Sequence, residues 1–370
     1  MLDHQFNGPS FTIGVEEELM IMDSRGLDLA QRIEDVLSAL PDGLTGQVKP
    51  ELMQSVLEVA TEPCPDVGAA GRQLAALRTA VADVAERLGL VIGASGTHPF
   101  ANWEQQEIVE RERYQELVSE LGYVARQELI FGTHVHVGIT GPNKAIYVAD
   151  GIRRYIPVLL GLSSNSPFWR GEATGMMSAR TPVFRAFPRV GVPPHYGSWE
   201  IYSRRVELMM ESGAIDDYTY LWWDVRPHPR LGTVETRVFD QQTRLDATLA
   251  LTALTAALAH RLSSLFDREE PMVEYPSELI DDNKVRAAIH GIEGQLIDFR
   301  EVRQVSAREM VRRMLDELAE HAQELGCEAE LAGVEDLIEN GTGARRQLGM
   351  YARNGDLRQL AREIADHTRP

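Results

Sequence analysis

The sequence predicts an α+β fold, with an antiparallel sheet in the first part of the chain and a helical C-terminal part. Strand-like segments lie near residues 11–22, 56–61, 90–95, 129–139 and 233–239, whereas the chain beyond about residue 245 reads as helices only. The strand-like segments alternate polar and apolar side chains, and buried parallel strands would instead be continuously apolar. The 370 residues are 44% hydrophobic, an ordinary globular composition. We expect one domain over residues 1–370, with a strand-rich core over about 1–245 and the helical part over about 246–370.

Three of the expected strands carry ionisable side chains on a single face. Because side chains alternate along a strand, residues two apart share a face. The pairs formed in this way are Glu16 with Glu18, His134 with His136, and Glu235 with Arg237. Glu17 points the other way, together with the apolar Val15 and Leu19. Carboxylates and imidazoles are costly to cluster and bury unless something neutralises them, and divalent metal ions or phosphates do so.

A fourth acidic segment spans residues 50–63. Its strand-like part places Glu58 and Glu62 on one face, and a proline ends it because proline cannot continue a sheet ladder. Glu51 lies upstream of this strand, and the alternation does not place it.

Helical patterns lie between and after these strands. Apolar residues recur at helical spacing over 74–88, and Gly89 stops the pattern. Further helices are expected over about 105–121, 142–162, 246–266, 283–298, 306–325, 334–340 and 355–367. Asp356 provides an N-cap signal for the last of them. Residues 164–200, rich in Pro, Gly, Ser and Arg, are expected to form a long, mostly irregular segment, as functional loops often do.

The acidic and imidazole pairs each have a functional and a structural interpretation. Glu16 and Glu18 lie in a strongly apolar strand and suit Mg²⁺ or Mn²⁺, although acidic triplets also occur as solvated charge runs. His134 and His136 suit a metal or a phosphate, and an H-x-H pattern also occurs in zinc hydrolases, where further ligands complete the site. The pattern by itself leaves these interpretations open.

Arginine side chains provide the candidate anion contacts. The chain has 34 arginines and only 3 lysines, and guanidinium groups bind carboxylates and phosphates in a bidentate way. Glu235 with Arg237 is either an ordinary ion pair or a metal ligand beside an anion clamp. Arg170 and Arg180 lie in the segment 164–200, where they are either anion contacts or parts of a structural loop.

The composition argues against several classes of function. The formal net charge of −19 argues for a soluble protein that does not have nucleic acid as a partner. No apolar run approaches the ~20 residues that span a bilayer, and residues 249–258 read as a buried helix. No signal peptide is visible, and Cys64 and Cys327 do not make a disulfide framework, so we expect a cytoplasmic protein without a membrane partner. The sequence contains no P-loop, Rossmann, G-x-S-x-G or H-E-x-x-H motif.

Seven segments carry a resemblance to a known family. They are Thr12–Leu19, Pro50–Pro63, Gly96–Phe100, Leu129–Gly138, Leu162–Gly171, Trp223–Gln241 and Val334–Gly343. In this order they span essentially the whole chain, which is more specific than any single motif. Together they resemble the bacterial type 2 glutamate–cysteine ligases, the carboxylate–amine ligases of the glutamine synthetase-like superfamily.

The resemblance implies a curved antiparallel sheet that holds ATP and Mg²⁺ (or Mn²⁺) on its concave face, with helices packed behind it. The implied metal ligands are Glu16, Glu18, Glu58, His134 and Glu235, with Glu51 as a further acidic position. Arg237 matches an arginine near the transferred phosphate, and it is expected with Glu58 to take part in catalysis. The residues expected to contact the nucleotide are Arg237, His136, Arg170 and Arg180. His136 stands at a position that is not always histidine in more distant ligases.

The implied reaction joins a carboxylate to an amine at the expense of ATP, through an acyl phosphate. By resemblance the substrates are glutamate and cysteine, and a homodimer fits the family. Two alternatives stay open at this point. One is a metal-dependent hydrolase that holds zinc with His134, His136 and the glutamates, and the other is a metabolite-binding relative without catalysis. The clustered glutamates argue against the second, because an idle site has no reason to hold them.

Overall fold

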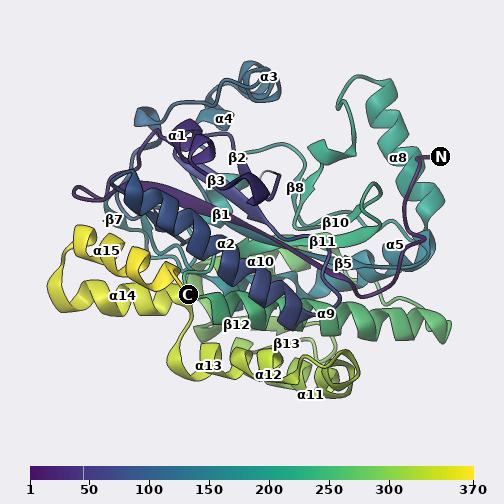
Figure 1. Ribbon diagram of the computed structural model, residues 1–370. Coiled ribbons are helices and arrows are strands. Elements are labelled where there is room, and N and C mark those ends of the chain that lie inside the picture. Colours follow the sequence, from purple (N-terminus) through teal and green to yellow (C-terminus); the bar gives the residue numbers. More distant parts are fainter. Residues whose placement is uncertain (45) are drawn as a thin grey trace.

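The computed structural model describes residues 1–44 and 46–370. Its centre is an antiparallel sheet (Figure 1), whose strands in spatial order are β10 (Val225–His228), β11 (Thr233–Asp240), β5 (Gly132–Gly138), β1 (Ile13–Asp23), β3 (Val56–Ala60) and β2 (Val48–Pro50), with β4 (Leu90–Gly93) paired to the end of β1. Every pairing within this sheet is antiparallel. The five expected strands all belong to it, so the predicted α+β class is confirmed.

The long strand β1 lies at the centre of the sheet, and its alternation sorts side chains between two faces. It pairs with β5 on one side and with β3 and β4 on the other. Val15 and Leu19 are fully buried on the face that packs against helices. Glu16 and Glu18 lie on the opposite face and are partly exposed. A central strand with helices on only one face therefore keeps an alternating sequence.

Helices cover one face of the sheet. They are α2 (Val67–Arg87), α5 (Pro142–Ile152), α6 (Ile156–Ser163) and α9 (Leu245–Asp267), and their apolar side chains form a continuous core with the sheet. Among the described residues, α9 is the one helix that is long and apolar enough to cross a bilayer by length and composition. Two thirds of its most apolar window (67%) is buried inside the protein, which is the burial of a core helix.

A buried ion pair joins β1 to this helical layer. Glu17 points away from its two glutamate neighbours, as predicted, and accepts hydrogen bonds of 2.6 and 2.7 Å from the guanidinium of Arg78 on α2. The two side chains are 0% and 1% exposed. Arg78 also donates to the carbonyl oxygens of Gln242, Thr243 and Thr368. One guanidinium therefore links the sheet, α2, the segment before α9 and the C-terminal end of the last helix.

The part of the chain beyond α9 is mostly helical, as predicted. Its helices are α10 (Ser277–His290), α11 (Ala307–Leu325), α12 (Glu328–Leu331), α13 (Gly333–Asn340), α14 (Gly343–Asn354) and α15 (Leu357–Thr368). Asp356 caps α15 as predicted, because its carboxylate accepts hydrogen bonds from the backbone N–H groups of Arg358 and Gln359. Helices α12 and α14 were not among the predicted elements.

The prediction of helices only beyond residue 245 is wrong in one place. The helix expected over 283–298 starts earlier, at Ser277, and ends before Gly291, whose φ of +58° favours glycine. The chain then forms a hairpin of β12 (Gln295–Asp298) and β13 (Arg303–Ser306). Each strand has only four residues, which is too short for the alternation to identify.

Short elements make up most of the remainder. They are α1 (Ile33–Ser38), α3 (Glu112–Leu121), α4 (Tyr123–Arg126), α7 (Arg180–Phe184), α8 (Trp199–Glu211), the hairpin of β6 (Phe168–Trp169) with β7 (Glu172–Ala173), and the parallel pair β8 (Val190–Gly191) with β9 (Trp222–Trp223). The helix expected from residue 105 begins only at Glu112. Residues 164–200 are mostly irregular, as predicted.

A buried carboxylate fixes the irregular segment to the sheet. Asp240, at the end of β11, is fully buried and accepts hydrogen bonds from the backbone N–H of Asn165 (2.8 Å) and from the hydroxyls of Ser166 (2.7 Å) and Ser178 (2.9 Å). The backbone N–H of Arg180 in turn donates to the Ser166 hydroxyl at 3.2 Å. The start of α7 is therefore held at a defined place beside the sheet.

Candidate active site

The face of the sheet that is turned away from the helices carries a row of ionisable side chains. The cross-strand register pairs Arg226 with Glu235, Glu235 with His136, His134 with Glu16, Glu18 with Glu58, and Glu58 with Lys49. Directly opposed residues have Cβ atoms within about 5 Å of each other. The register of six neighbouring strands therefore brings together groups that are far apart in the sequence.

Most of these side chains form the floor of a cleft of about 260 Å³, and Glu235, His136 and Lys49 lie beside it in contact with the floor residues. The ionisable residues that line it are Glu16, Glu18, Glu51, Glu58, Glu128, His134, Arg113, Arg226 and Arg237. Its aromatic lining residues are Tyr114, Phe187, Tyr220 and Trp222. A smaller adjoining hollow of about 40 Å³ shares Glu18, Glu51, Glu128, His134 and Arg237 with the cleft and adds Arg180. The polar faces of the three predicted strands thus meet at one cavity, together with Glu51 and Glu58 of the fourth acidic segment.

The acidic side of the cleft holds more negative charge than nearby cations balance. Burial raises the pKa of the Glu58 carboxyl to about 8, and the charges of Glu16 and Glu18 add to the shift while Lys49 opposes it. The Lys49 Nζ lies 3.5 Å from Glu58 Oε1. Burial and the neighbouring glutamates also raise the pKa of Glu51 well above its ordinary value. A divalent cation would supply the missing positive charge.

The two histidines are oriented through one ring nitrogen and leave the other unpaired. His134 Nδ1 lies 3.1 Å from Glu16 Oε2, and His136 Nδ1 lies 2.9 Å from Thr233 Oγ1. Both Nε2 atoms are buried without a hydrogen-bond partner. They lie 3.8 Å from Glu18 Oε1 and 3.7 Å from Glu16 Oε1, respectively. Burial opposes ionisation of Glu16, but the two histidines outweigh it and hold the pKa of that carboxyl well below its ordinary value.

This set of donor atoms fits divalent metal ions. Two ligands of one ion, each about 2.1 Å from it, lie about 3 to 4.2 Å apart. The separations of 3.7 and 3.8 Å between imidazole and carboxylate atoms fall in that range. Glu16, His136 and Glu235 also offer ligand atoms within 4.8 Å of one another. Because most of the donors are carboxylate oxygens, the site favours Mg²⁺ or Mn²⁺ over softer ions.

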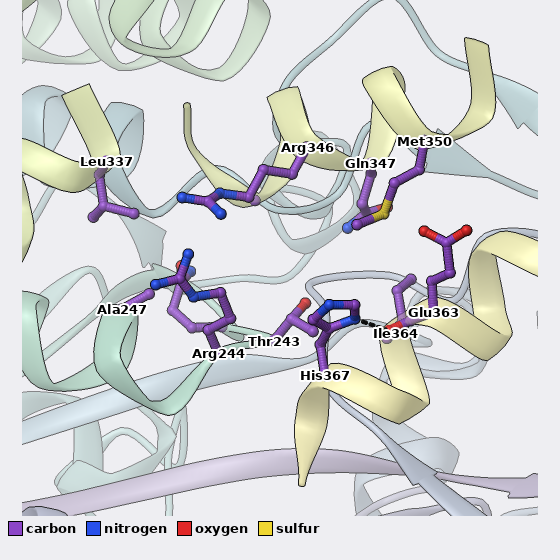
Figure 2. A pocket seen from close by; sticks show the side chains of 12 residues that line it. Thr243, Arg244, Ala247, Leu337, Arg346, Gln347, Met350, Glu363, Ile364 and His367 are labelled. Carbon is purple, nitrogen blue, oxygen red and sulfur yellow. Dashed lines mark hydrogen bonds between the residues drawn. The ribbon is translucent and has the colours of Figure 1, made fainter. Parts of the chain in front are cut away.

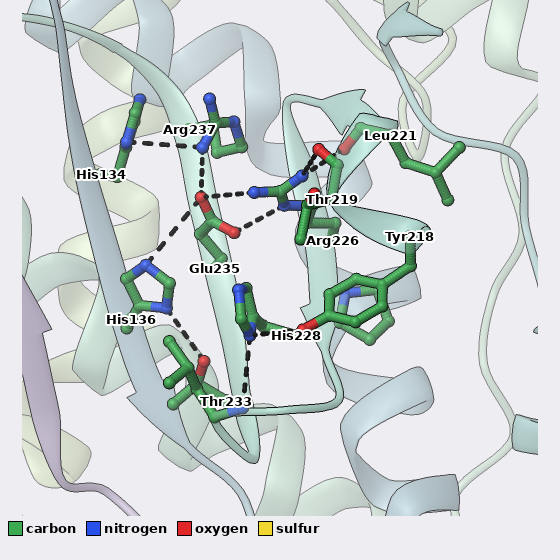
Figure 3. A network of polar contacts seen from close by, with 12 residues as sticks. His134, His136, Tyr218, Thr219, Leu221, Arg226, His228, Thr233, Glu235 and Arg237 are labelled. Atoms are coloured by element: carbon green, nitrogen blue, oxygen red, sulfur yellow. Dashed lines mark hydrogen bonds and ion pairs between the residues drawn. The ribbon is translucent and has the colours of Figure 1, made fainter. Parts of the chain in front are cut away.

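Glu235 is clamped between two guanidinium groups (Figure 3). Arg226 Nε donates to Glu235 Oε2 at 2.6 Å, and Arg237 Nη1 donates to the other carboxylate oxygen. Arg226 also donates to the carbonyl oxygens of Thr219 and Leu221, which fixes its position. Burial opposes ionisation of Glu235, but the two arginines outweigh it and keep its pKa well below the ordinary value. A metal ion that took Glu235 as a ligand would compete with these arginines for its oxygens.

Arg180 is a buried cation that has no carboxylate in direct contact within the described part of the chain, although the Asp240 carboxylate lies close enough to feel its charge. Arg180 opens α7, is 5% exposed, and makes no ion pair within the described residues. Its Nη atoms lie 3.4 Å from the carbonyl oxygens of Arg237 and Val238, and its Nε has no partner. Its guanidinium passes over Gly132, where an added Cβ would lie only 2.6 Å from Nη2. The structure thus places a second arginine beside Arg237, at the hollow that adjoins the cleft.

Arg170 is the one predicted site residue that neither lines the cleft nor contacts a residue that lines it; Glu235 and His136 lie just beside the cleft, where they contact Arg226 and Glu16. It has a φ of +55° in the turn between β6 and β7, and its guanidinium pairs with Glu104 at 2.9 Å. Arg170 and Arg180 lie in the same irregular segment, but the fold places them at different sites. The predicted position of Glu62 beside Glu58 is also not realised, because Glu62 lies beyond β3 and is exposed.

Three ionisable residues that line the cleft were not predicted from the sequence, namely Glu128, Arg113 and Arg226. Glu128 lies in the loop before β5, and burial together with the charges of Glu18 and Glu51 raises its pKa well above the ordinary value. No periodic pattern surrounds Glu128, so the sequence offers no signal for it. Arg226 could have been found from its place in a short strand next to a turn that leads into β11, because a hairpin would oppose it to Glu235.

A separate pocket of about 80 Å³ lies away from these residues (Figure 2). It is formed by the segment before α9 and by α13, α14 and α15, and its lining includes Thr243, Arg244, Arg346, Met350 and His367. His367 Nδ1 lies 2.7 Å from the backbone carbonyl oxygen of Glu363, one turn earlier. The pocket contains none of the predicted site residues, so the cleft on the sheet is the candidate active site.

Solved structures share this fold. The crystal structure of glutamate–cysteine ligase from Francisella tularensis in complex with AMP superposes with a TM-score of 0.72 at 14% identity, over 100% of this chain and 90% of that chain. A bifunctional glutathione synthetase from Pasteurella multocida gives a TM-score of 0.69 at 16% identity, over 97% of this chain and 52% of that chain. At such low identities, these similarities establish the fold alone.

Sequence comparison establishes the family as well as the fold. The profile described as glutamate-cysteine ligase family 2 (GCS2) matches residues 12–363. A Rubrobacter xylanophilus protein named "Putative glutamate--cysteine ligase 2-1" is 43% identical over 369 residues, covering 100% of this chain and 98% of that protein. A Sorangium cellulosum protein named "Putative glutamate--cysteine ligase 2" is 41% identical over 360 residues, covering 97% of this chain and 96% of that protein. The chain belongs to glutamate–cysteine ligase family 2.

Proposed function

We propose that this protein is an ATP-dependent carboxylate–amine ligase that joins glutamate to cysteine. The observation that carries the proposal is the single cleft in which five glutamates, a histidine and three arginines of the chain converge on one face of the sheet. Phosphoryl transfer to a carboxylate brings two anions together, so it needs dense positive charge from metal ions and guanidinium groups. Family membership supports the same class of reaction. None of the relatives described above is named as a hydrolase.

We propose the carboxylates and one imidazole of the floor as the metal-binding set. Its members are Glu16, Glu18, Glu51, Glu58, His134 and Glu235. Mg²⁺ held there would neutralise the phosphate oxygens of ATP and the charge that develops on them. The unpaired Nε2 of His134 and the raised pKa values of Glu51 and Glu58 support this assignment.

The proposed reaction has two steps. An oxygen of the substrate carboxylate attacks the γ-phosphorus of ATP, the bond to the β-phosphate oxygen breaks, and ADP leaves. The nitrogen of the neutral amine then attacks the carbonyl carbon of the acyl phosphate and loses a proton to solvent, and inorganic phosphate leaves with the electrons of the broken C–O bond. Arg237 and Arg180 hold the transferred phosphoryl group, and Arg226 fixes Glu235 and through it Arg237. His136, oriented by Thr233, completes the contacts on this side of the cleft.

We also propose how the chain is organised and where it acts. The core that joins the sheet to α9 continues into α11 and α13, which supports one domain over residues 1–370. Cys64 and Cys327 are free and buried, which suits the reducing cytoplasm.

The reaction itself can be tested by an ADP-release assay. We expect ADP to form only with MgATP, an acid substrate and an amine, with L-glutamate and L-cysteine as the best pair in a panel. With ¹⁸O in the glutamate γ-carboxylate, we expect one ¹⁸O atom in each phosphate released, because the acyl phosphate leaves with a substrate oxygen. EDTA should abolish the activity, and Mg²⁺ should restore it. Phosphate without ¹⁸O would contradict the acyl phosphate, and ester or amide hydrolysis without ATP would favour the zinc-hydrolase alternative.

The role of Arg180 can be tested without replacing it. In Gly132→Ala the new methyl group would lie 2.6 Å from Arg180 Nη2 and must displace the guanidinium. We expect kcat/KM for ADP release to fall by about 10- to 100-fold, because a displacement of about 1 Å in a positioning group costs up to about 100-fold. Gly349→Ala is the matched control, because nothing lies within 4 Å of its added Cβ. Equal activity of the two variants would show that Arg180 does not contact the substrates.

A further inference from the structure

A second group of potential metal ligands lies on the helical side of the molecule. His260 of α9 and His321 of α11 face each other with 3.0 Å between their Nδ1 atoms. Glu324, one turn beyond His321, places Oε2 3.4 Å from His260 Nε2. The three residues each offer a ligand atom, and these atoms lie within 4.8 Å of one another. None of them belongs to the cleft described above.

The surroundings leave this group available to a ligand. The His260 side chain is 14% exposed and that of Glu324 is 53% exposed, so solvent reaches one side of the group. Arg261, the adjacent cation, is engaged by Glu317 at 3.0 Å and does not pair with Glu324. On the inner side, the ring of Phe11 packs against His260 at 4.6 Å between centroids. The imidazoles therefore lie between the ring of Phe11 on the inner side and the solvent-exposed carboxylate of Glu324 on the outer side.

The contact between the two histidines requires a neutral ring. Two Nδ1 atoms at 3.0 Å are held by a hydrogen bond only if one of them accepts, and a protonated ring cannot accept. Neutral imidazole is also the form that binds metals.

We propose that His260, His321 and Glu324 form a binding site for Zn²⁺ or a similar borderline divalent ion, separate from the active site. Two imidazole nitrogens and one carboxylate are a donor set typical of zinc, whereas Mg²⁺ takes oxygen ligands almost entirely. Three protein ligands leave a fourth position to water on the exposed side. The ion cross-links α9, the central core helix, to α11 and thereby stabilises the packing of the C-terminal helices on the sheet layer.

The site can be tested on the full-length, metal-free protein by zinc titration against a chromophoric chelator in excess Mg²⁺. We expect the wild type to bind one zinc ion more than His321→Gln. We expect Glu324→Gln, whose side chain is exposed, to weaken this binding at least about 10-fold, because even outer partners of a metal contribute that much. The matched control is His290→Ala, which removes an exposed histidine from the C-terminal end of α10. It should bind zinc like the wild type.

Two further measurements make the outcome unambiguous. A hundred-fold excess of zinc over its Kd should raise the unfolding midpoint of the wild type by about 4 °C and that of His321→Gln by much less. Co²⁺ in place of zinc should give visible d–d absorption that His321→Gln loses. Equal stoichiometry and affinity in wild type and His321→Gln would overturn the proposal. Zinc binding that disappears only in His134→Gln would place the ion in the cleft and would overturn it as well.

Discussion

Glu58→Gln is expected to lower the rate of ADP release by about 10²- to 10³-fold while making the metal-free protein more stable. The loss of rate follows from the loss of one anionic ligand in a site where charge neutralisation stabilises the transition state, and comparable single losses cost that much. Glutamine keeps the shape of the side chain, so the change removes charge and not packing. Activity is measured as kcat for ADP release and stability as the free energy of unfolding in EDTA.

The raised pKa of Glu58 implies that Glu58→Gln stabilises the folded protein at neutral pH. The pKa of Glu58 in the folded protein, about 8, lies above its value in an unfolded chain, so the unfolded state releases the proton first as the pH rises. The carboxyl therefore costs stability increasingly between about pH 4.5 and 8, and at pH 7 Glu58→Gln should gain at least about 1 kcal/mol. The gain should vanish below pH 4. Glu62→Gln, at an exposed position four residues on, should change neither property. A fully active Glu58→Gln enzyme would remove Glu58 from the proposed site.

Arg78→Met is expected to lower the free energy of unfolding by about 3 to 5 kcal/mol. The substitution leaves Glu17 as a buried charge without its partner, and removing one member of a fully buried ion pair typically costs this much. It also leaves the carbonyl oxygens of Gln242, Thr243 and Thr368 without their guanidinium donor. Denaturant unfolding of the full chain measures the effect.

The double variant Glu17→Leu/Arg78→Met separates the two possible causes. If the loss comes from the unpaired charge, removing Glu17 as well should restore most of the stability, because apolar replacements of buried ion pairs are often neutral. If the double variant is as unstable as Arg78→Met, the carbonyl contacts dominate and the ion pair contributes little.

Features set by neighbouring residues could be predicted from the sequence, whereas features set by contacts between residues far apart in the chain could not. Alternation along single strands correctly assigned Glu16, Glu18, His134, His136 and Glu17 to their faces, because the period of a strand is a local property. The same approach could not find Glu128, which lies in a loop and reaches the cleft only through tertiary packing. It also could not separate Arg170 from Arg180, because Asp240, far away in the sequence, binds Ser166 and Ser178 of that segment and so decides where the segment docks.

The C-terminal elements show the same limit. Long amphipathic helices such as α11 were found from their periodicity, whereas the hairpin of β12 and β13 was missed. Its strands are too short to show a recognisable alternation of polar and apolar residues. They are defined only by their hydrogen bonding to each other in the folded protein. The predicted metal-binding role of the glutamates rests on the family resemblance and on geometry, and the experiments above decide it.

The distribution of side chains between the two faces of β1 also affects whether this strand adopts the correct register during folding. Three consecutive glutamates mean that a slip of β1 by one residue would still present a glutamate to Arg78. That error would turn a second glutamate into the core and carry Val15 and Leu19 out to the cleft. The ion pair with Arg78 therefore cannot by itself select the correct register of this strand. Burial of the apolar side chains of β1 selects the register. Replacing Val15 or Leu19 by alanine should therefore increase the misfolded fraction more than the lost buried volume alone would predict.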